Sequence, residues 1–210
     1  MKRSTKNILI IVGSSVVLLG LMSFFIARKR RNKIDCKDNV LFLGNSQTAN
    51  SSGYVEKLQK HCKNSNFTKV AKVGAKSDWI LNEYKSLIEK GKEYDWVSIM
   101  IGGNDIFARL KIDKTKQNLQ EIFELAKKNG SKIMFISSPS KKFYDRSTPK
   151  HLELAMELEN WVKENKLVNV FVPITDITSK QELFRSDMLH INNEGQEVVF
   201  KEILKKAKFK

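Results

Sequence analysis

Short apolar runs alternate with longer segments of helical periodicity from residue 39 to the C-terminal end of the sequence. Continuous apolar runs of this length are typical of strands that are buried on both faces of a sheet. We expect strands at residues 40–43, 69–73, 96–101, 132–137 and 169–172, and helices at residues 51–63, 78–90, 114–129, 151–165 and 194–208. Strands that alternate with helices pair in parallel. The sequence therefore predicts one α/β domain over residues 34–210, with helices on both faces of a parallel five-stranded sheet.

The N-terminal segment, residues 1–33, has a different character. Residues 8–27 form a stretch of 20 without a charged side chain. As a helix this stretch would span about 30 Å, the thickness of the hydrocarbon core of a bilayer. A cleaved signal peptide is the alternative, but its apolar core is shorter, roughly 7–15 residues, and no small-x-small cleavage site precedes the basic cluster here. We expect residues 1–33 to be a single-pass transmembrane anchor with basic flanks.

The net charge of +15 belongs in large part to this anchor. Residues 1–33 contain eight basic and no acidic side chains, which leaves 30 basic against 23 acidic residues, or +7, in the remaining chain. This distribution argues against a nucleic-acid-binding protein, in which basic residues gather on the folded domain and alternate with aromatic ones. We expect no nucleic-acid partner.

The only two cysteines are Cys36 and Cys62. They could form a disulfide if the domain faces an oxidising compartment, and two reduced thiols are equally compatible with the sequence. No group of cysteines and histidines has the spacing of metal ligands, so we expect neither a metal nor a cofactor.

Unusual residues follow several of the predicted strands. Ligands of open α/β sheets bind outside the carboxyl ends of the strands. At these positions lie Gly-Asn-Ser at residues 44–46, Gly74, and Gly-Gly-Asn-Asp at residues 102–105, while Asp-Met-Leu-His at residues 187–190 precedes the last helix. Each motif alone has an ordinary structural explanation, because glycine and asparagine favour turns and serine caps helices.

Together these motifs fit one catalytic site. A serine hydroxyl needs a base within hydrogen-bond reach, and the base needs a third group that fixes its tautomer. Asp187 and His190 are three residues apart, so on a helical turn their side chains would share a face. We therefore expect Ser46 to be a nucleophile, with His190 as its base and Asp187 as the group that orients the imidazole. The backbone N–H groups of Ser46 and Gly74 and the amide of Asn104 could form an oxyanion hole.

These residues resemble the SGNH, or GDSL-type, hydrolase family. That family has a Gly-Asp-Ser motif on the first loop, a glycine after the second strand, Gly-x-Asn-Asp after the third and Asp-x-x-His near the end, and the four blocks described above occur in this order. The resemblance implies a flavodoxin-like three-layer fold and an acyl-ester hydrolase that needs no metal. Asn45 departs from the usual aspartate, which leaves the subfamily and its substrate open.

The other histidines, His61 and His151, have no carboxylate placed as Asp187 is, and we expect both at the surface. Trp96 and Trp161 are expected to pack in or near the core. Asp78 and Trp79 follow Gly74 closely, so we expect them to border the pocket.

The leading hypothesis is a serine esterase that removes a small acyl group, such as acetyl, from a carbohydrate or lipid. An O-acyltransferase would use the same acyl-enzyme, and an inactive membrane-tethered binding module would keep the fold without turnover. Basic residues flank both ends of residues 8–27, so the positive-inside rule only slightly favours a cytoplasmic domain. An enzyme of envelope polymers would instead be extracytoplasmic, and the sequence leaves the orientation and the oligomeric state open.

Overall fold

The sheet has five parallel strands, as the alternating pattern predicts. The computed structural model describes residues 33–139, 148–175 and 180–209. Its strands follow the order β2-β1-β3-β4-β5, so the chain reverses its direction of winding after β2. Their bounds are β1 (Asn39–Gly44), β2 (Asn66–Ala71), β3 (Trp96–Met100), β4 (Lys132–Ile136) and β5 (Val170–Val172). The α/β class and the parallel five-stranded sheet are confirmed.

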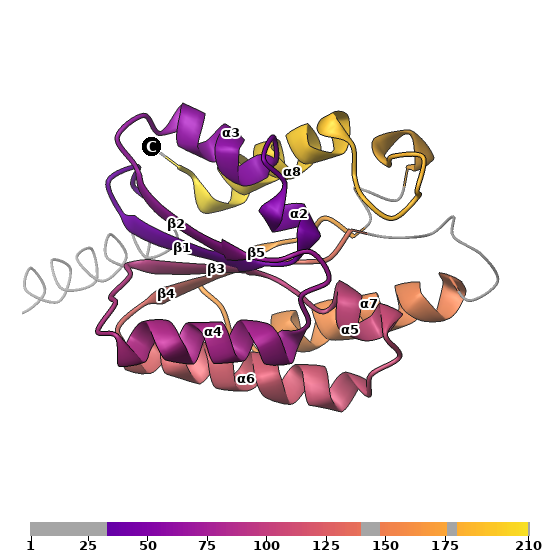
Figure 1. The fold of residues 1–210 in the computed structure, drawn as a ribbon, viewed down its shortest axis with the longest axis horizontal. Helices are drawn as coiled ribbons and strands as arrows, with labels where there is room; N and C mark the ends of the chain where they lie inside the picture. Colours follow the sequence, from indigo (N-terminus) through magenta and orange to yellow (C-terminus); the bar gives the residue numbers. More distant parts are fainter. Residues whose placement is uncertain (1–32, 140–147, 176–179, 210) are drawn as a thin grey trace, which may run out of the picture. The chain divides into compact units, whose positions relative to one another are not determined.

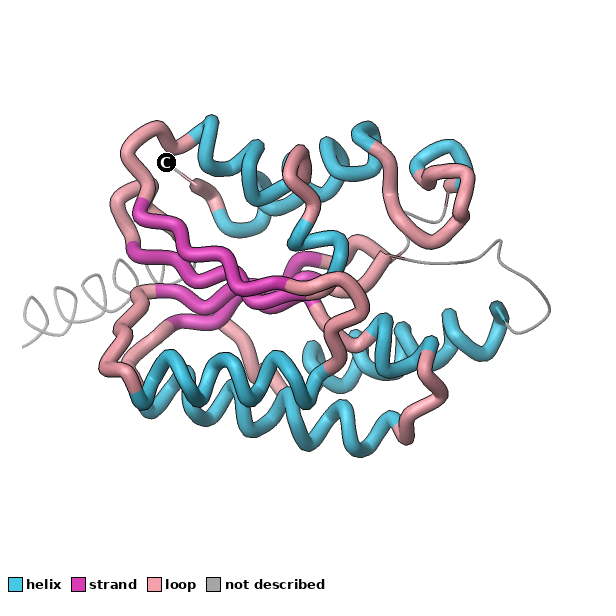
Figure 2. The backbone as a smooth tube through the Cα atoms, viewed as in Figure 1, coloured by secondary structure: helices cyan, strands magenta, loops and turns pink. Residues whose placement is uncertain are grey.

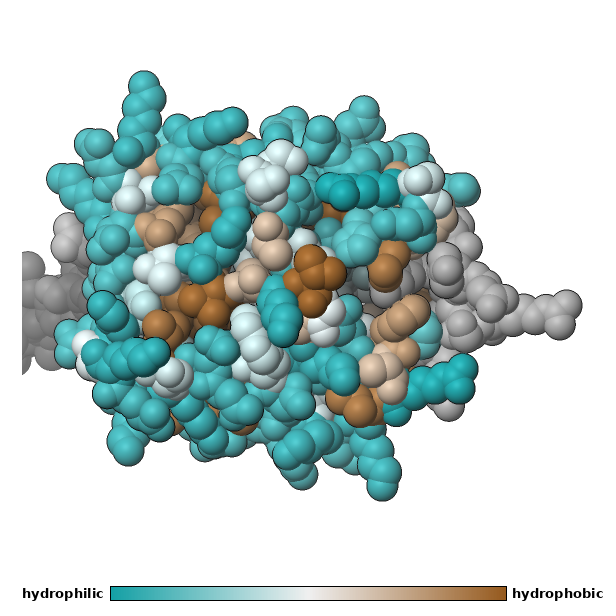
Figure 3. Space-filling model, viewed as in Figure 1, coloured by the Kyte–Doolittle hydropathy of each residue, from teal (hydrophilic) through white to brown (hydrophobic). Residues whose placement is uncertain are grey.

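Helices cover both faces of this sheet, as Figures 1 and 2 show. On one face lie α3 (Tyr54–His61) and α8 (Asn193–Ala207). On the other face lie α4 (Ser77–Glu89), α6 (Ile112–Lys128) and α7 (Thr148–Glu164). The face of the domain seen in Figure 3 is mainly hydrophilic, with apolar residues in small separate patches, as expected where amphipathic helices turn their polar sides outward.

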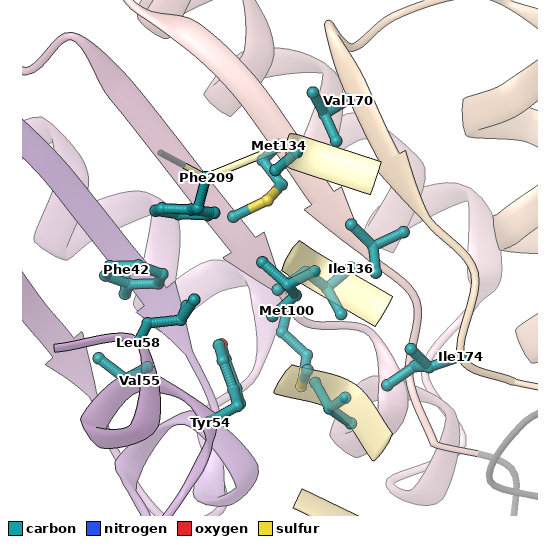
Figure 4. Close-up of a cluster of buried hydrophobic side chains, with 14 of the residues drawn as sticks. Phe42, Tyr54, Val55, Leu58, Met100, Met134, Ile136, Val170, Ile174 and Phe209 are labelled. Carbon is teal, nitrogen blue, oxygen red and sulfur yellow. The ribbon is translucent and has the colours of Figure 1, made fainter. Parts of the chain in front are cut away.

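Alternate residues of the strands supply the two halves of the core. Phe42 packs with Tyr54 and Leu58 of α3 (Figure 4). Val40 belongs to the same buried cluster, to which α8 also contributes. Because successive side chains of a strand point to opposite faces, the intervening residue Leu41 packs against the helices of the other layer. The central strand β3 is buried along its whole length. This rigid sheet fixes the positions of the loops that leave its carboxyl ends.

The structure corrects several predicted boundaries. The second strand was expected at residues 69–73 but spans Asn66–Ala71, and the helix expected from residue 51 begins at Tyr54. Two short helices, α2 (Ser46–Ala49) and α5 (Gly103–Phe107), were expected to be loops. A helix of four or five residues is too short to show a 3.6-residue period, so the sequence contains no signal for it.

The predicted anchor, residues 1–33, falls almost entirely on residues 1–32, outside the described residues. Within the described ranges no helix is long and apolar enough to cross a membrane. The described domain starts where Ile34 is buried and its N–H donates to the carbonyl of Ala207 at 3.0 Å. Nearby, Cys36 and Cys62 form a disulfide, with their Cα atoms 5.1 Å apart. It links the segment before β1 to the end of α3.

Candidate active site

Ser46 is the first residue of α2, and Asn45 alone separates it from the end of β1. The end of β1 packs very closely against α2. There is no room for a side chain at Gly44, because an added Cβ would lie 1.9 Å from Oγ1 of Thr48. Thr48 is buried, and its hydroxyl lies 2.9 Å from that of the buried Tyr54 on α3. Through Thr48, the helix that begins with Ser46 is therefore anchored in the part of the core beneath α3.

Asn45 is the N-cap of α2. Its Oδ1 accepts a hydrogen bond from the N–H of Gln47 at 3.0 Å, and the side chain is buried. A cap of this kind needs an acceptor oxygen, which asparagine and aspartate both supply. The change from the usual aspartate to Asn45 therefore leaves the geometry of the serine turn intact.

His190 lies on a loop that is closed upon itself. An isolated antiparallel bridge joins Phe184 to Ile191, and the N–H of Arg185 donates to the carbonyl of His190 at 2.8 Å. Asp187 Oδ1 accepts the N–H groups of Leu189 and His190, each at 2.9 Å. Residues 187–190 were expected to form a helical turn, but they are turn and bend residues, and the carboxylate itself organises them.

The loop brings Asp187 and His190 to Ser46. Asp187 Oδ2 lies 2.7 Å from Nδ1 of His190, and Nε2 of His190 lies 3.0 Å from Oγ of Ser46. Both distances are within hydrogen-bond range. When Nδ1 donates its proton to the carboxylate, Nε2 is left as an acceptor for the serine hydroxyl. The three side chains are therefore joined by two hydrogen bonds in series, and the proton of Ser46 can pass to Nε2 of His190.

The same contacts stabilise the ionised form of Asp187. Partial desolvation by burial acts to raise the pKa, but the backbone N–H and side chain of His190 and the N–H of Leu189 outweigh it and lower the pKa to about 2. Asp187 is therefore ionised at neutral pH. A carboxylate at this position favours a positive charge on the imidazole, as a base needs after it accepts a proton.

Asn104 and Gly74 lie on neighbouring loops. Asn104 is in α5, and its Nδ2 donates to the carbonyl of Ala75 at 2.8 Å. A side-chain amide carries a second N–H, which remains available to another acceptor. Asn104 and Ser46 line one small hollow of about 20 Å³ together with Ser138. Gly74 is exposed with φ +75°, a conformation that favours glycine, but it is not among the residues that line this hollow.

A buried network supports the helix that carries Asn104. The carboxylate of Asp105 accepts the N–H of Ser77 at 3.1 Å and its hydroxyl at 2.5 Å, and Asn118 Nδ2 donates to Oγ of Ser77 at 2.8 Å. Burial raises the pKa of Asp105, although these hydrogen bonds oppose the rise. The network ties α4, α5 and α6 together. Asp105 has a structural role next to Asn104.

Two further residues at the site were missed in the sequence. Gln47 is buried, and its Nε2 donates to the carbonyl of Leu189 at 3.3 Å, which connects α2 to the loop of His190. Arg185 lines a second hollow beside Ser46 and His190. Gln47 follows the serine directly and Arg185 precedes Asp187 by two residues, so proximity to the motifs was the one available signal.

The remaining candidates lie away from these contacts. His61 is exposed, as expected, whereas His151 is half-buried and its ring centroid lies 6.2 Å from that of Phe107. Asp78 and Trp79 line neither hollow that contains Ser46. Trp79 instead packs under the ammonium group of Lys72, 5.7 Å from the ring centroid.

Solved structures with this architecture include two named esterases and TesA. The acetylxylan esterase Axe2 from Geobacillus stearothermophilus is 18% identical with a TM-score of 0.66, covering 85% of this chain and 97% of that one. The esterase EstA from Pseudoalteromonas sp. is 20% identical with a TM-score of 0.64, covering 81% and 97%. TesA is 20% identical with a TM-score of 0.65, covering 79% and 96%. At these identities the likeness establishes the fold.

The family itself is identified from the sequence. A search of curated proteins finds no match to this chain. The family model described as GDSL-like lipase/acylhydrolase matches residues 42–198, three quarters of the chain, from β1 to α8. This range contains all the contacts between Ser46, Asp187 and His190. The chain therefore belongs to the GDSL-like lipase/acylhydrolase family.

Proposed function

We propose that this protein is a serine esterase in which Ser46 is the nucleophile, His190 the general base and Asp187 the residue that orients the imidazole. The observation that carries the proposal is the pair of contacts at 3.0 Å and 2.7 Å that joins Ser46 through His190 to Asp187. Membership of an acylhydrolase family supports it.

The reaction follows from this geometry in two halves. Oγ of Ser46 attacks the ester carbonyl carbon while Nε2 of His190 takes the hydroxyl proton. As the tetrahedral intermediate collapses, the carbon–oxygen bond to the alcohol breaks and the alcohol leaves with the proton from Nε2. A water molecule then attacks the acyl carbon while Nε2 of His190 takes one of its protons. The bond from the acyl carbon to Oγ breaks, Oγ receives the proton from Nε2, and the acid leaves.

The negative charge on the carbonyl oxygen requires hydrogen-bond donors. The N–H of Ser46 is one candidate, since it belongs to the first turn of α2, where N–H groups have no partner within the helix. The free N–H of the Asn104 amide is the second and the N–H of Gly74 the third. Asn104 has the stronger support, because it lines the hollow at Ser46 and Gly74 does not.

The acyl group is proposed to be small. The hollow between Ser46 and Asn104 measures about 20 Å³, room for a group near the size of a methyl or a water molecule. An acetyl ester fits this space. The named esterases with this fold, an acetylxylan esterase among them, are consistent with an acetyl ester of a carbohydrate as the substrate.

The test is hydrolysis of a chromogenic acetyl ester by the full-length protein and two serine variants. S46A should lose turnover, while its circular dichroism spectrum stays that of the wild type. The matched control, S86A, removes a hydroxyl from α4 away from the site and should keep wild-type activity. Undiminished turnover by S46A would contradict the proposal. Product analysis with a carbohydrate acceptor distinguishes hydrolysis from acyl transfer, which uses the same intermediate.

We also propose that residues 1–33 tether the domain to a membrane and that the domain is extracytoplasmic. The uncharged stretch at residues 8–27 supports the tether, and the disulfide between Cys36 and Cys62 supports an oxidising compartment. The measurement is alkylation of free thiols in intact cells, followed by mass analysis without reduction. Two alkylated cysteines would contradict the proposed compartment.

A further inference from the structure

A second hollow borders Ser46 and His190, and the proposed hydrolysis leaves it without a role. It measures about 410 Å³, some twenty times the volume of the hollow at Asn104. An ester has two parts, and the site must accommodate both. The small hollow has room for a short acyl group, and the large one has room for the alcohol part.

The lining of the large hollow is polar and without acidic residues. Asn50, Ser51 and Ser52 contribute amide and hydroxyl groups, which can donate and accept hydrogen bonds. Val73 adds an apolar surface that is 71% exposed. Hydroxyl and amide groups beside one apolar contact suit a sugar, which has hydroxyl groups and apolar C–H faces.

Arg185 is the one permanently charged residue of this lining. Its backbone is fixed, because its N–H donates to the carbonyl of His190 at 2.8 Å and its carbonyl accepts the N–H of Met188 at 2.8 Å. Among the described residues no carboxylate forms an ion pair with its side chain. The nearest acid in sequence, Asp187, is engaged by His190 and by two backbone N–H groups.

We propose that the large hollow binds the alcohol part of the ester and that Arg185 selects alcohols with an anionic group, a carboxylate or a phosphate. The inference rests on the proposed esterase function, and it assigns the substrate class: small acyl esters of acidic carbohydrates. A guanidinium group binds carboxylate and phosphate oxygens through two parallel hydrogen bonds, which adds geometric selection to the charge. The loop that carries the base would thus also carry the residue that recognises the substrate.

The experiment compares three acetyl esters that share the acetyl position. These are an O-acetyl methyl glucoside, the corresponding O-acetyl glucuronide and O-acetyl glucose 6-phosphate. The full-length wild type, R185Q, R185K and the control R109Q are assayed by acetate release. Arg109 is the other arginine among the described residues, and R109Q removes the same charge away from the hollow. The readout is the ratio of kcat/KM for each anionic ester to kcat/KM for the neutral one.

We expect the wild type to prefer at least one anionic ester by about tenfold, the size of one charge-assisted bidentate contact. R185Q should abolish the preference through KM, R185K should keep part of it, and R109Q should retain it. The preference should weaken as salt concentration rises. If the glucuronide ester is preferred, Arg185 recognises a carboxylate, and if the 6-phosphate ester is preferred, it recognises a phosphate.

Equal rates on all three esters, or a preference that R185Q retains, would overturn the role of Arg185 while the esterase function stands. Failure to cleave any ester, together with no reaction of Ser46 with a fluorophosphonate, would overturn the esterase function and this inference with it. The two failures are therefore distinguishable.

Discussion

The two segments that meet at the site are held in different ways. The segment of Ser46 is built into the core, with Gly44 packed against Thr48 and Asn45 buried as a helix cap. The loop of His190 lies at the surface, and the Asp187 side chain is 47% exposed. Hydrogen bonds within residues 184–191 maintain that loop.

Because the two segments are held differently, we expect substitutions in them to affect stability and catalysis to different extents. A change in the serine segment disturbs close packing and should lower the free energy of unfolding. A change in the histidine loop removes local contacts at an exposed position, where substitutions cost little stability. Substitutions in the histidine loop should therefore lower kcat with little effect on the free energy of unfolding. Substitutions in the serine segment should lower both.

After the loss of turnover in S46A, the largest expected effect is that of D187N on turnover. Loss of the carboxylate leaves His190 without the group that fixes its tautomer, and kcat should fall by about 10³–10⁴. The free energy of unfolding, measured in urea at neutral pH, should fall only slightly, because the amide oxygen of an asparagine can still accept the N–H groups of Leu189 and His190. A large loss of stability with near-normal kcat would reverse the comparison between the segments.

N104A should lower kcat by about 10²–10³, the cost of one oxyanion donor. The amide of Asn104 also donates to the carbonyl of Ala75, so its loss could displace the loop that contains Ala75. KM for a small ester is the control, because a displaced loop should change KM as well as kcat. A fall confined to kcat supports the role of a donor. An unchanged kcat would remove Asn104 from the oxyanion hole.

G44A tests the serine segment. The added Cβ would meet Thr48 at 1.9 Å, so the helix must shift, and we expect a loss of about 1–3 kcal/mol in the free energy of unfolding. Denaturation in urea measures it, with D187N as the comparison. If G44A were as stable as the wild type, the serine segment would be less tightly packed than described.

The smallest effect concerns the titration of Asp187. Its pKa is lowered to about 2 in the folded protein, so its stabilising contribution is present above the ordinary value, near pH 4, and is lost as pH falls towards 2. Carboxyl ¹³C NMR should show this midpoint. In H190A the midpoint should rise, because the imidazole contacts are gone, yet remain below the ordinary value because the two backbone N–H groups still donate.

The sequence predicted the buried part of the fold better than its edges. Strand β3 is recognisable because each of its residues from Trp96 to Met100 is buried and all but Ser98 are apolar. Strand β2 lies at the edge of the sheet and has no fully buried residue, so its hydrophobic pattern is weak and its predicted position was shifted. The disulfide depends on the 5.1 Å separation of two Cα atoms, which no spacing of cysteines reveals.

At the site, the motifs identified the residue types but not the way each is held. Asp187 and His190 were predicted to meet on a helical turn, whereas Asp187 bonds to the backbone of a non-helical loop. Gln47 and Arg185 belong to no motif. Their positions depend on where the 184–191 loop folds against α2, a long-range contact that local sequence patterns do not encode.

The most direct test of the proposed mechanism is reaction of the full-length protein with a fluorophosphonate, followed by peptide mass mapping. The proposed role of Ser46 predicts a single phosphonyl adduct on the peptide that contains Ser46, and no adduct in S46A. Labelling should also slow strongly in H190A, because the hydroxyl loses its base. An adduct on another serine, or no adduct in the folded wild type, would contradict Ser46 as the nucleophile.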